Sequence, residues 1–147
     1  MSDSQIPRSF LQDKAGPDAS QNWLASLHIL IVDDDEINRK LLSYMLTHRV
    51  RTLTLIPSGA EALAIVQSGE VDLVIMDLRM PDMDGWEVIG AIRQMEKERA
   101  RHIPIIATTA NTSFSECAKA LEAGADTCLN RPFSAGGLLS AMRPPDV

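Results

Sequence analysis

The sequence lacks any long hydrophobic run and any excess of positive charge. Uninterrupted aliphatic runs, such as 29–32 and 73–76, are far shorter than the roughly 20 residues that a membrane-spanning helix needs. Lys and Arg number 14 against 20 Asp and Glu, which gives a formal net charge of −6. This balance argues against a nucleic-acid-binding surface and suits a domain that binds a cation or a basic partner.

The N-terminus also lacks the basic start and the apolar stretch of a secretory signal. We therefore expect a cytoplasmic protein that makes no contact with a membrane. Cysteine is scarce as well, because Cys117 and Cys128 are the only two. Their spacing matches neither a disulfide framework nor a metal site, so we expect two ordinary half-buried thiols in a reducing compartment.

The composition indicates one globular domain with short tails. The chain has 147 residues, of which 45% are hydrophobic and 23% charged, a normal globular balance. Residues 1–26 are rich in Ser, Asp, Gln and Pro and show no sustained period, which predicts a flexible tail. Docking or self-packing by its few apolar residues remains an alternative. We expect the domain itself to span 27–143, followed by a C-terminal tail at 144–147.

From residue 27 onward, short aliphatic runs alternate with helical patterns. The runs that predict strands lie at 28–32, 51–56, 72–76, 103–108 and 126–130. Five strands that alternate with five helices predict an α/β fold, a flavodoxin-like (βα)5 doubly wound parallel sheet. In its strand order, 2-1-3-4-5, the ligand crevice lies at the carboxyl ends of strands 1 and 3.

Acidic residues follow both of these strands. Asp33, Asp34 and Asp35 come after the first strand, and Asp77 comes after the third. Neighbouring carboxylates raise each other's pKa unless a cation lies among them, and oxygen ligands on a partly solvated rim suit Mg²⁺ best. Acidic residues also stabilise helix starts, which accounts for Asp35 and Glu36 but not for Asp77. The sequence therefore predicts a Mg²⁺ site.

Two further groups are expected at the same edge of the sheet. The fourth strand ends in Thr108 and Thr109, and the fifth runs into Arg131. A carboxylate nucleophile, a divalent metal, a hydroxyl donor and a cation that converge on one crevice form a phosphoryl-transfer site.

Four segments carry a resemblance to a known family. They are ILIVDDDEINRKLL, DLVIMDLRMPDMDG, PIIATTAN and NRPF. Together they resemble the receiver (CheY-like) domain of two-component response regulators, over roughly residues 27–143. The sequences of the two acidic segments are most similar to those of receivers attached to hybrid histidine kinases. The resemblance implies a bacterial signal-transduction or phosphorelay protein.

The resemblance implies a role for each acidic residue. Asp77 would be the phosphoacceptor, and Asp33, Asp34 and Asp77 would hold Mg²⁺ with the backbone carbonyl of Arg79 as a further ligand. The phosphate would come from a histidine kinase or a histidine phosphotransfer domain. Such a domain is not an enzyme in the usual sense, because it catalyses only its own phosphorylation and dephosphorylation. The cognate kinase and the downstream protein partner stay open, and so does the choice between a stand-alone regulator and part of a hybrid kinase.

By the same resemblance, Thr109 would donate a hydrogen bond to the phosphoryl group, Arg131 would supply positive charge, and the Arg131–Pro132 peptide bond would be cis. Two positions depart from the family pattern. Arg131 stands where the family has Lys, and Cys128 stands where an aromatic residue is common. We expect Arg131 to pair with Asp77 or Asp33 at rest. We also expect the domain to accept phosphate while the face formed by its last two helices and fifth strand changes little.

Two alternatives remain at this stage. The two departures favour a pseudo-receiver, the same fold acting as a protein-binding module with little phosphorylation. The spacing of Asp33 and Asp35 is also reminiscent of haloacid-dehalogenase phosphatases, with the first Asp as nucleophile and the second as acid/base. The phosphatase alternative is disfavoured because those enzymes have longer chains and a further acidic pair. In this sequence the next acidic residue at the end of a strand is the single Asp77.

Overall fold

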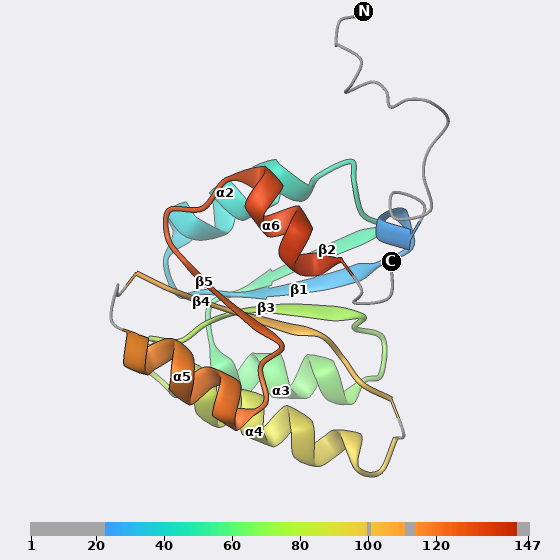
Figure 1. Ribbon diagram of the computed structural model, residues 1–147. Coiled ribbons are helices and arrows are strands. Elements are labelled where there is room, and N and C mark those ends of the chain that lie inside the picture. Colours follow the sequence, from blue (N-terminus) through green and yellow to red (C-terminus); the bar gives the residue numbers. More distant parts are fainter. Residues whose placement is uncertain (1–22, 100, 111–113, 144–147) are drawn as a thin grey trace, which may run out of the picture.

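The computed structural model describes residues 23–99, 101–110 and 114–143. They form one parallel five-stranded sheet with helices on both faces (Figure 1). The strands are β1 (His28–Val32), β2 (Thr52–Ile56), β3 (Leu73–Asp77), β4 (Ile105–Thr109) and β5 (Thr127–Asn130). The helices are α2 (Glu36–Leu46), α3 (Gly59–Gln67), α4 (Gly85–Glu96), α5 (Phe114–Ala123) and α6 (Ala135–Met142). The sheet order is β2-β1-β3-β4-β5, so the predicted flavodoxin-like topology is confirmed.

The sheet separates two hydrophobic cores. Helices α2 and α6 cover one face, and α3, α4 and α5 cover the other (Figure 1). Every residue of β1 and β3 is buried, as expected for central strands with helices on both sides. Along β1, Ile29 and Ile31 pack on the side of α2 and α6, whereas Leu30 and Val32 pack on the other side. In the part of the chain described here, no helix is long and apolar enough to cross a membrane.

Packing begins slightly earlier in the chain than the sequence predicts. Residues 23–25 form a helical turn, and Leu24 and Leu27 are buried in the core beside α2 and α6. Residues 23–26, which the sequence predicts to belong to the tail, therefore lie at the surface of the domain, with Leu24 packed into it. Most of the expected tail, residues 1–22, and the C-terminal tail at 144–147 lie outside the described residues.

The cysteines form a disulfide bond, so the prediction of two free thiols is wrong. The sulfur atoms of Cys117 and Cys128 lie 2.00 Å apart and their Cα atoms 5.6 Å apart. Cys117 belongs to α5 and Cys128 to β5, and α5 packs directly against β5. Spacing along the sequence did not reveal this contact, because it arises from the return of the chain after α5. The disulfide ties α5 to the edge strand of the sheet.

Candidate functional site: an acidic pocket at the end of the sheet

Three carboxylates meet at the carboxyl end of the two central strands. Val32 of β1 is paired in register with Met76 of β3, so the residues that follow, Asp33 and Asp77, emerge side by side. One carboxylate oxygen from each of Asp33, Asp34 and Asp77 lies within 4.8 Å of the others. Asp33 is 1% exposed and Asp77 3% exposed, whereas Asp34 is exposed to solvent.

The surroundings disfavour ionisation of the two buried carboxyls. Burial and the neighbouring charge of Asp33 raise the pKa of Asp77 from 3.8 to about 6. Arg131 and the backbone N–H of Arg79 oppose this rise. Burial, the largest cause, also raises the pKa of Asp33, while the Asp35 N–H and the charge of Arg131 oppose the rise. Two acids that are costly to ionise side by side favour a cation between them.

The donor set fits a hard divalent cation. Oδ1 of Asp33 accepts a hydrogen bond from the backbone N–H of Asp35 at 2.9 Å. Oδ2 of Asp33 is buried and accepts no hydrogen bond from the residues that the structure describes. A buried carboxylate oxygen without a donor is costly unless it binds a cation. All three residues offer oxygen atoms, which are the ligands of Mg²⁺.

Arg131, the residue after β5, contacts the carboxylates. Its Nη1 donates to Thr108 Oγ1 at 3.0 Å and to Asp77 Oδ1 at 3.3 Å, and it lies 3.9 Å from Asp33 Oδ2. The expected resting contact of Arg131 with Asp77 or Asp33 is therefore present with both. The Arg131–Pro132 peptide bond is cis, as expected. Thr108, which the sequence reading left without a role, anchors the guanidinium.

The hydroxyl of Thr109 points to a residue that the sequence reading missed. Thr109 is fully buried, and its Oγ1 donates to Oε1 of Glu116 at 2.8 Å. Oε2 of Glu116 accepts from Nε of Arg79 at 2.6 Å and also from Nη2. This carboxylate raises the pKa of Arg79 through its hydrogen bond and its charge. In the sequence, Glu116 looks like an ordinary acid at a helix start, and only the packing of α5 shows that it is buried.

One pocket of about 470 Å³ collects these groups. The residues that line it are Asp34, Asp35, Asn38, Asp77, Arg79, Thr109, Ala110 and Arg131. Five of the six predicted site residues thus line one pocket, and the sixth, Asp33, lies buried beside Asp77. The structure therefore brings the predicted set together from β1, β3, β4 and β5.

The position of Asp35 speaks against the phosphatase alternative. Its side chain caps α2, with Oδ1 accepting from the backbone N–H of Ile37 at 2.9 Å. Although Asp35 lines the same pocket, its Oδ1 is engaged in this cap, and a capping carboxylate accepts a backbone hydrogen bond instead of exchanging a proton with substrate. The second acid that a haloacid-dehalogenase mechanism needs is therefore absent from this position.

An apolar groove adjoins the acidic pocket. It has a volume of about 250 Å³ and shares Asn38 and Arg131 with the acidic pocket, its other lining residues being Leu41, Leu42, Met45, Pro132 and Phe133. Ile37 and Leu41 on the same helix, α2, are exposed by 68% and 53%. The mouth of the acidic pocket is thus bordered by a surface that suits a protein partner.

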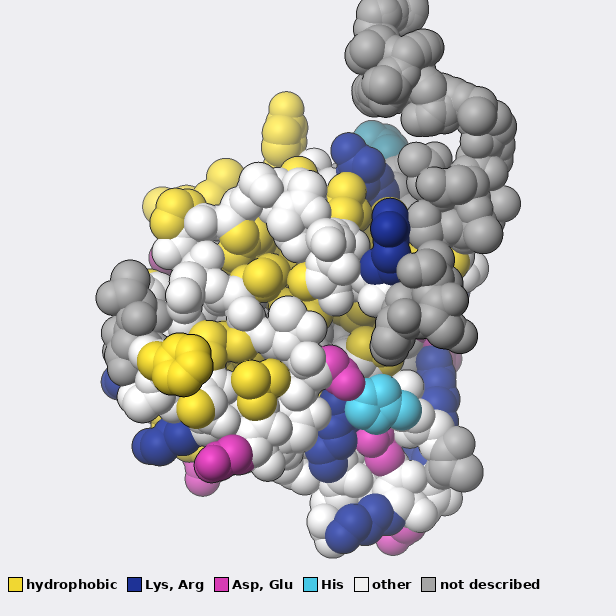
Figure 2. Space-filling model, viewed as in Figure 1, with side chains coloured by type: hydrophobic (Ala, Val, Ile, Leu, Met, Phe, Trp, Pro, Cys, Tyr) yellow, Lys and Arg dark blue, Asp and Glu magenta, His cyan; other side chains and the backbone are white. Residues whose placement is uncertain are grey.

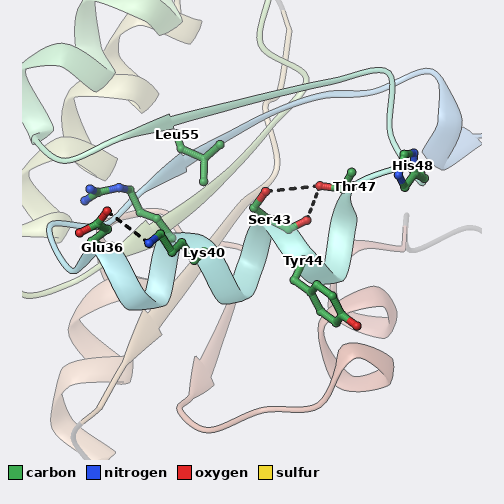
Figure 3. A pocket seen from close by; sticks show the side chains of 8 residues that line it. Glu36, Lys40, Ser43, Tyr44, Thr47, His48 and Leu55 are labelled. Atoms are coloured by element: carbon green, nitrogen blue, oxygen red, sulfur yellow. Dashed lines mark hydrogen bonds and ion pairs between the residues drawn. The ribbon is translucent and has the colours of Figure 1, made fainter.

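A third groove runs along α2 and β2 (Figure 3). Glu36 and Lys40 of this groove form an ion pair at 3.5 Å, and Arg39 donates to the backbone carbonyl of Asp33 at 2.7 Å. The hydroxyl groups of Ser43 and Thr47 lie 3.3 Å apart on the next turn, as the dashed lines in Figure 3 show. None of the predicted site residues lines this groove.

Comparisons with known proteins agree with this geometry. The family model described as the response regulator receiver domain matches residues 29–143. Hybrid signal transduction histidine kinase B of Dictyostelium discoideum is 33% identical over 123 residues, which cover 78% of this chain but only 6% of that kinase. The chain therefore corresponds to a small part of that relative.

Two solved structures show the same arrangement. The receiver domain of the histidine kinase CKI1 from Arabidopsis thaliana, complexed with Mg²⁺ and BeF3⁻, superposes with a TM-score of 0.71 at 29% identity, covering 83% of this chain and 93% of that one. The receiver domain of Ssk1 from Saccharomyces cerevisiae, solved with the histidine phosphotransfer protein Ypd1, gives a TM-score of 0.70 at 31% identity, covering 78% and 85%. On its sequence, fold and acidic pocket, this chain belongs to the response regulator receiver domain family.

Proposed function

We propose that this domain takes a phosphoryl group from a phosphohistidine onto Asp77, with Mg²⁺ held by Asp33, Asp34, Asp77 and the backbone carbonyl of Arg79. The observation that carries the proposal is the buried Asp77 carboxylate, with two further acids on one side and a guanidinium on the other. The orphaned Oδ2 of Asp33 supports the metal part of the proposal. The Mg²⁺ complex of the CKI1 receiver supports it as well.

The proposed step is an in-line displacement at phosphorus. A carboxylate oxygen of Asp77 attacks, a bond from that oxygen to phosphorus forms, and the bond from phosphorus to the imidazole nitrogen breaks. The leaving nitrogen keeps the electron pair and takes up a proton, so the products are an aspartyl phosphate and a neutral histidine. When bound, Mg²⁺ neutralises charge on the phosphoryl oxygens.

The protein side chains position the nucleophile and offset its charge. The backbone N–H of Arg79 donates to Asp77 Oδ1 at 3.3 Å, and Arg131 donates to the same oxygen. Both contacts hold Oδ1 in place, which leaves the other oxygen of Asp77 to act as the nucleophile. Arg131 then lies where it meets negative charge on the phosphoryl group, a role of the kind that Lys or Arg commonly plays at transferred phosphates.

We place the phosphate donor over the apolar groove beside the pocket. A histidine that reaches Asp77 from the α2 side would pass the apolar groove with Leu41 and the neighbouring exposed side chain of Ile37. A histidine phosphotransfer domain or a histidine kinase is the partner that this surface would meet, in line with the complex of the Ssk1 receiver with Ypd1.

A downstream partner has a separate surface available. The face formed by α5, β5 and α6 carries exposed hydrophobic side chains (Figure 2), among them Phe114 and Leu121.

The proposal is tested by labelling the chain with radioactive phosphoramidate, with and without Mg²⁺. The parent should take up label only with Mg²⁺, and Asp77→Asn should take up none. Asp35→Asn is the matched control, because Asn caps a helix as well as Asp does and Asp35 is another acid at the rim of the same pocket. Label on Asp77→Asn would refute the assignment of Asp77. A folded parent without label would favour the pseudo-receiver, a binding module that is not phosphorylated.

A further inference from the structure

Glu116 is a buried carboxylate that the proposed reaction does not use. It is 4% exposed and lies in the first turn of α5. Its two oxygens contact two different residues of the acidic pocket, Oε1 the hydroxyl of Thr109 and Oε2 the guanidinium of Arg79. Glu116 therefore connects the ends of β4 and β3 to α5.

The contact with Thr109 competes with the proposed role of that residue. A threonine hydroxyl has a single hydrogen to donate, and here Thr109 donates it to Glu116 over 2.8 Å. The same hydrogen cannot serve a phosphoryl oxygen on Asp77 until the hydroxyl turns away from Glu116. Because the acceptor is a carboxylate, the bond that must break is a strong one.

Arg79 keeps this carboxylate in place. A buried carboxylate is costly without a charged partner, and the guanidinium of Arg79 provides one while remaining 67% exposed itself. The backbone of Arg79 meanwhile contacts Asp77, so the chain segment next to the phosphoacceptor also carries the partner of Glu116.

The disulfide fixes the position of Glu116 from the other side. Cys117, the next residue, is bonded to Cys128 of β5, which pairs with Ala107 of β4 in the sheet. The first turn of α5 is thus tied to the sheet two residues before Thr109. This covalent tie limits how far Glu116 can move together with Thr109.

We propose that Glu116 is a positioning residue that holds the Thr109 hydroxyl away from the phosphoryl site until Asp77 is phosphorylated. The inference rests on the proposed function, and it adds an opposing contact that the phosphorylated state must overcome. A weaker contact between Glu116 and Thr109 should therefore favour the phosphorylated state.

The test is a titration of the full chain with beryllofluoride, a mimic of the phosphoryl group, at constant Mg²⁺. In Glu116→Gln a neutral acceptor replaces the carboxylate, and since charged hydrogen bonds are roughly twice as strong as neutral ones, the affinity should rise about fivefold. Glu122→Gln on the same helix is the matched control and should bind like the parent, because Glu122 is exposed. In a Thr109→Ala background, Glu116→Gln should have no further effect.

Each other outcome overturns the inference. A parent that binds no beryllofluoride overturns both the proposed function and this inference. A parent that binds, with Glu116→Gln unchanged, overturns the inference alone. A rise that persists in the Thr109→Ala background would mean that Glu116 acts only through its charge. Should Glu116→Gln fail to fold, Glu116→Asp keeps the charge for Arg79 but is too short for Thr109, and it should raise the affinity in the same direction.

Discussion

Replacing Asp77 by Asn should stabilise the metal-free fold at neutral pH. In the folded protein the pKa of Asp77 is raised from 3.8 to about 6, mainly by burial and then by the charge of Asp33. Because the folded state holds a proton on Asp77 more tightly than the unfolded state does, ionised Asp77 destabilises the fold. At about 1.4 kcal/mol per pKa unit, this difference lowers the free energy of unfolding by about 3 kcal/mol at pH values above the folded pKa.

The effect has a defined pH window. Above about pH 6 Asp77 is ionised in both states, and Asp77→Asn should gain the full stabilisation. As the pH falls from about 6 to 3.8, the folded parent becomes protonated first, so its disadvantage shrinks. Below 3.8 both states are protonated and the two proteins should be equally stable.

Thermal and urea melts in EDTA measure the difference. For a domain of this size, about 3 kcal/mol corresponds to a rise of roughly 10 °C in Tm at neutral pH, and the rise should vanish at acidic pH. Asp34→Asn serves as the control, because Asp34 is exposed and its removal should change the metal-free Tm little. An Asp77→Asn variant that is less stable than the parent at neutral pH, or a gap that does not depend on pH, would refute the reasoning.

Three further predictions follow from the disulfide, the apolar groove and Arg131. Reduction should lower the stability of the parent by about 3 kcal/mol, given a closed loop of 11 residues. Melts with and without dithiothreitol measure this loss, and a Cys117→Ser/Cys128→Ser double variant should not respond to the reductant. Leu41→Glu should slow transfer from a phosphohistidine protein about tenfold but leave labelling by phosphoramidate unchanged. Leu121→Glu on α5, across the sheet, is the control. An equal loss with the phosphohistidine protein and with phosphoramidate would place the defect in the acidic pocket. Arg131→Lys should keep labelling and enlarge the amide chemical-shift changes that beryllofluoride and Mg²⁺ produce over α5, β5 and α6. If the parent already shows large chemical-shift changes and Arg131→Lys shows the same ones, then Arg131 in place of Lys has no effect on the response.

The fold and most of the acidic pocket could be predicted because both depend on short patterns. Aliphatic runs of strand length set the sheet, and parallel strands 1 and 3 place the residues after them at one edge. This is why Asp33 and Asp77 meet as predicted. The capping of α2 by Asp35 likewise follows from its position just before a helical stripe.

The missed features depend on side-chain packing between segments far apart in the sequence. The Cys117–Cys128 bond needs α5 to lie against β5, a contact that no local pattern encodes. The role of Glu116 depends on its burial against Thr109 and on the reach of the Arg79 side chain from the loop after β3 to α5. Such contacts are set by the packing of helices on the sheet, whereas sequence spacing reports only on the residues within each element.

The most direct test of the central claim is to locate the phosphoryl group chemically. After phosphorylation with phosphoramidate and Mg²⁺, borohydride reduces an aspartyl phosphate to homoserine, which mass spectrometry of peptides can map. We expect homoserine at position 77 and at no other acidic residue, and none without Mg²⁺. Conversion at Asp33 or Asp34, or phosphate found only on residues outside the acidic pocket, would contradict it.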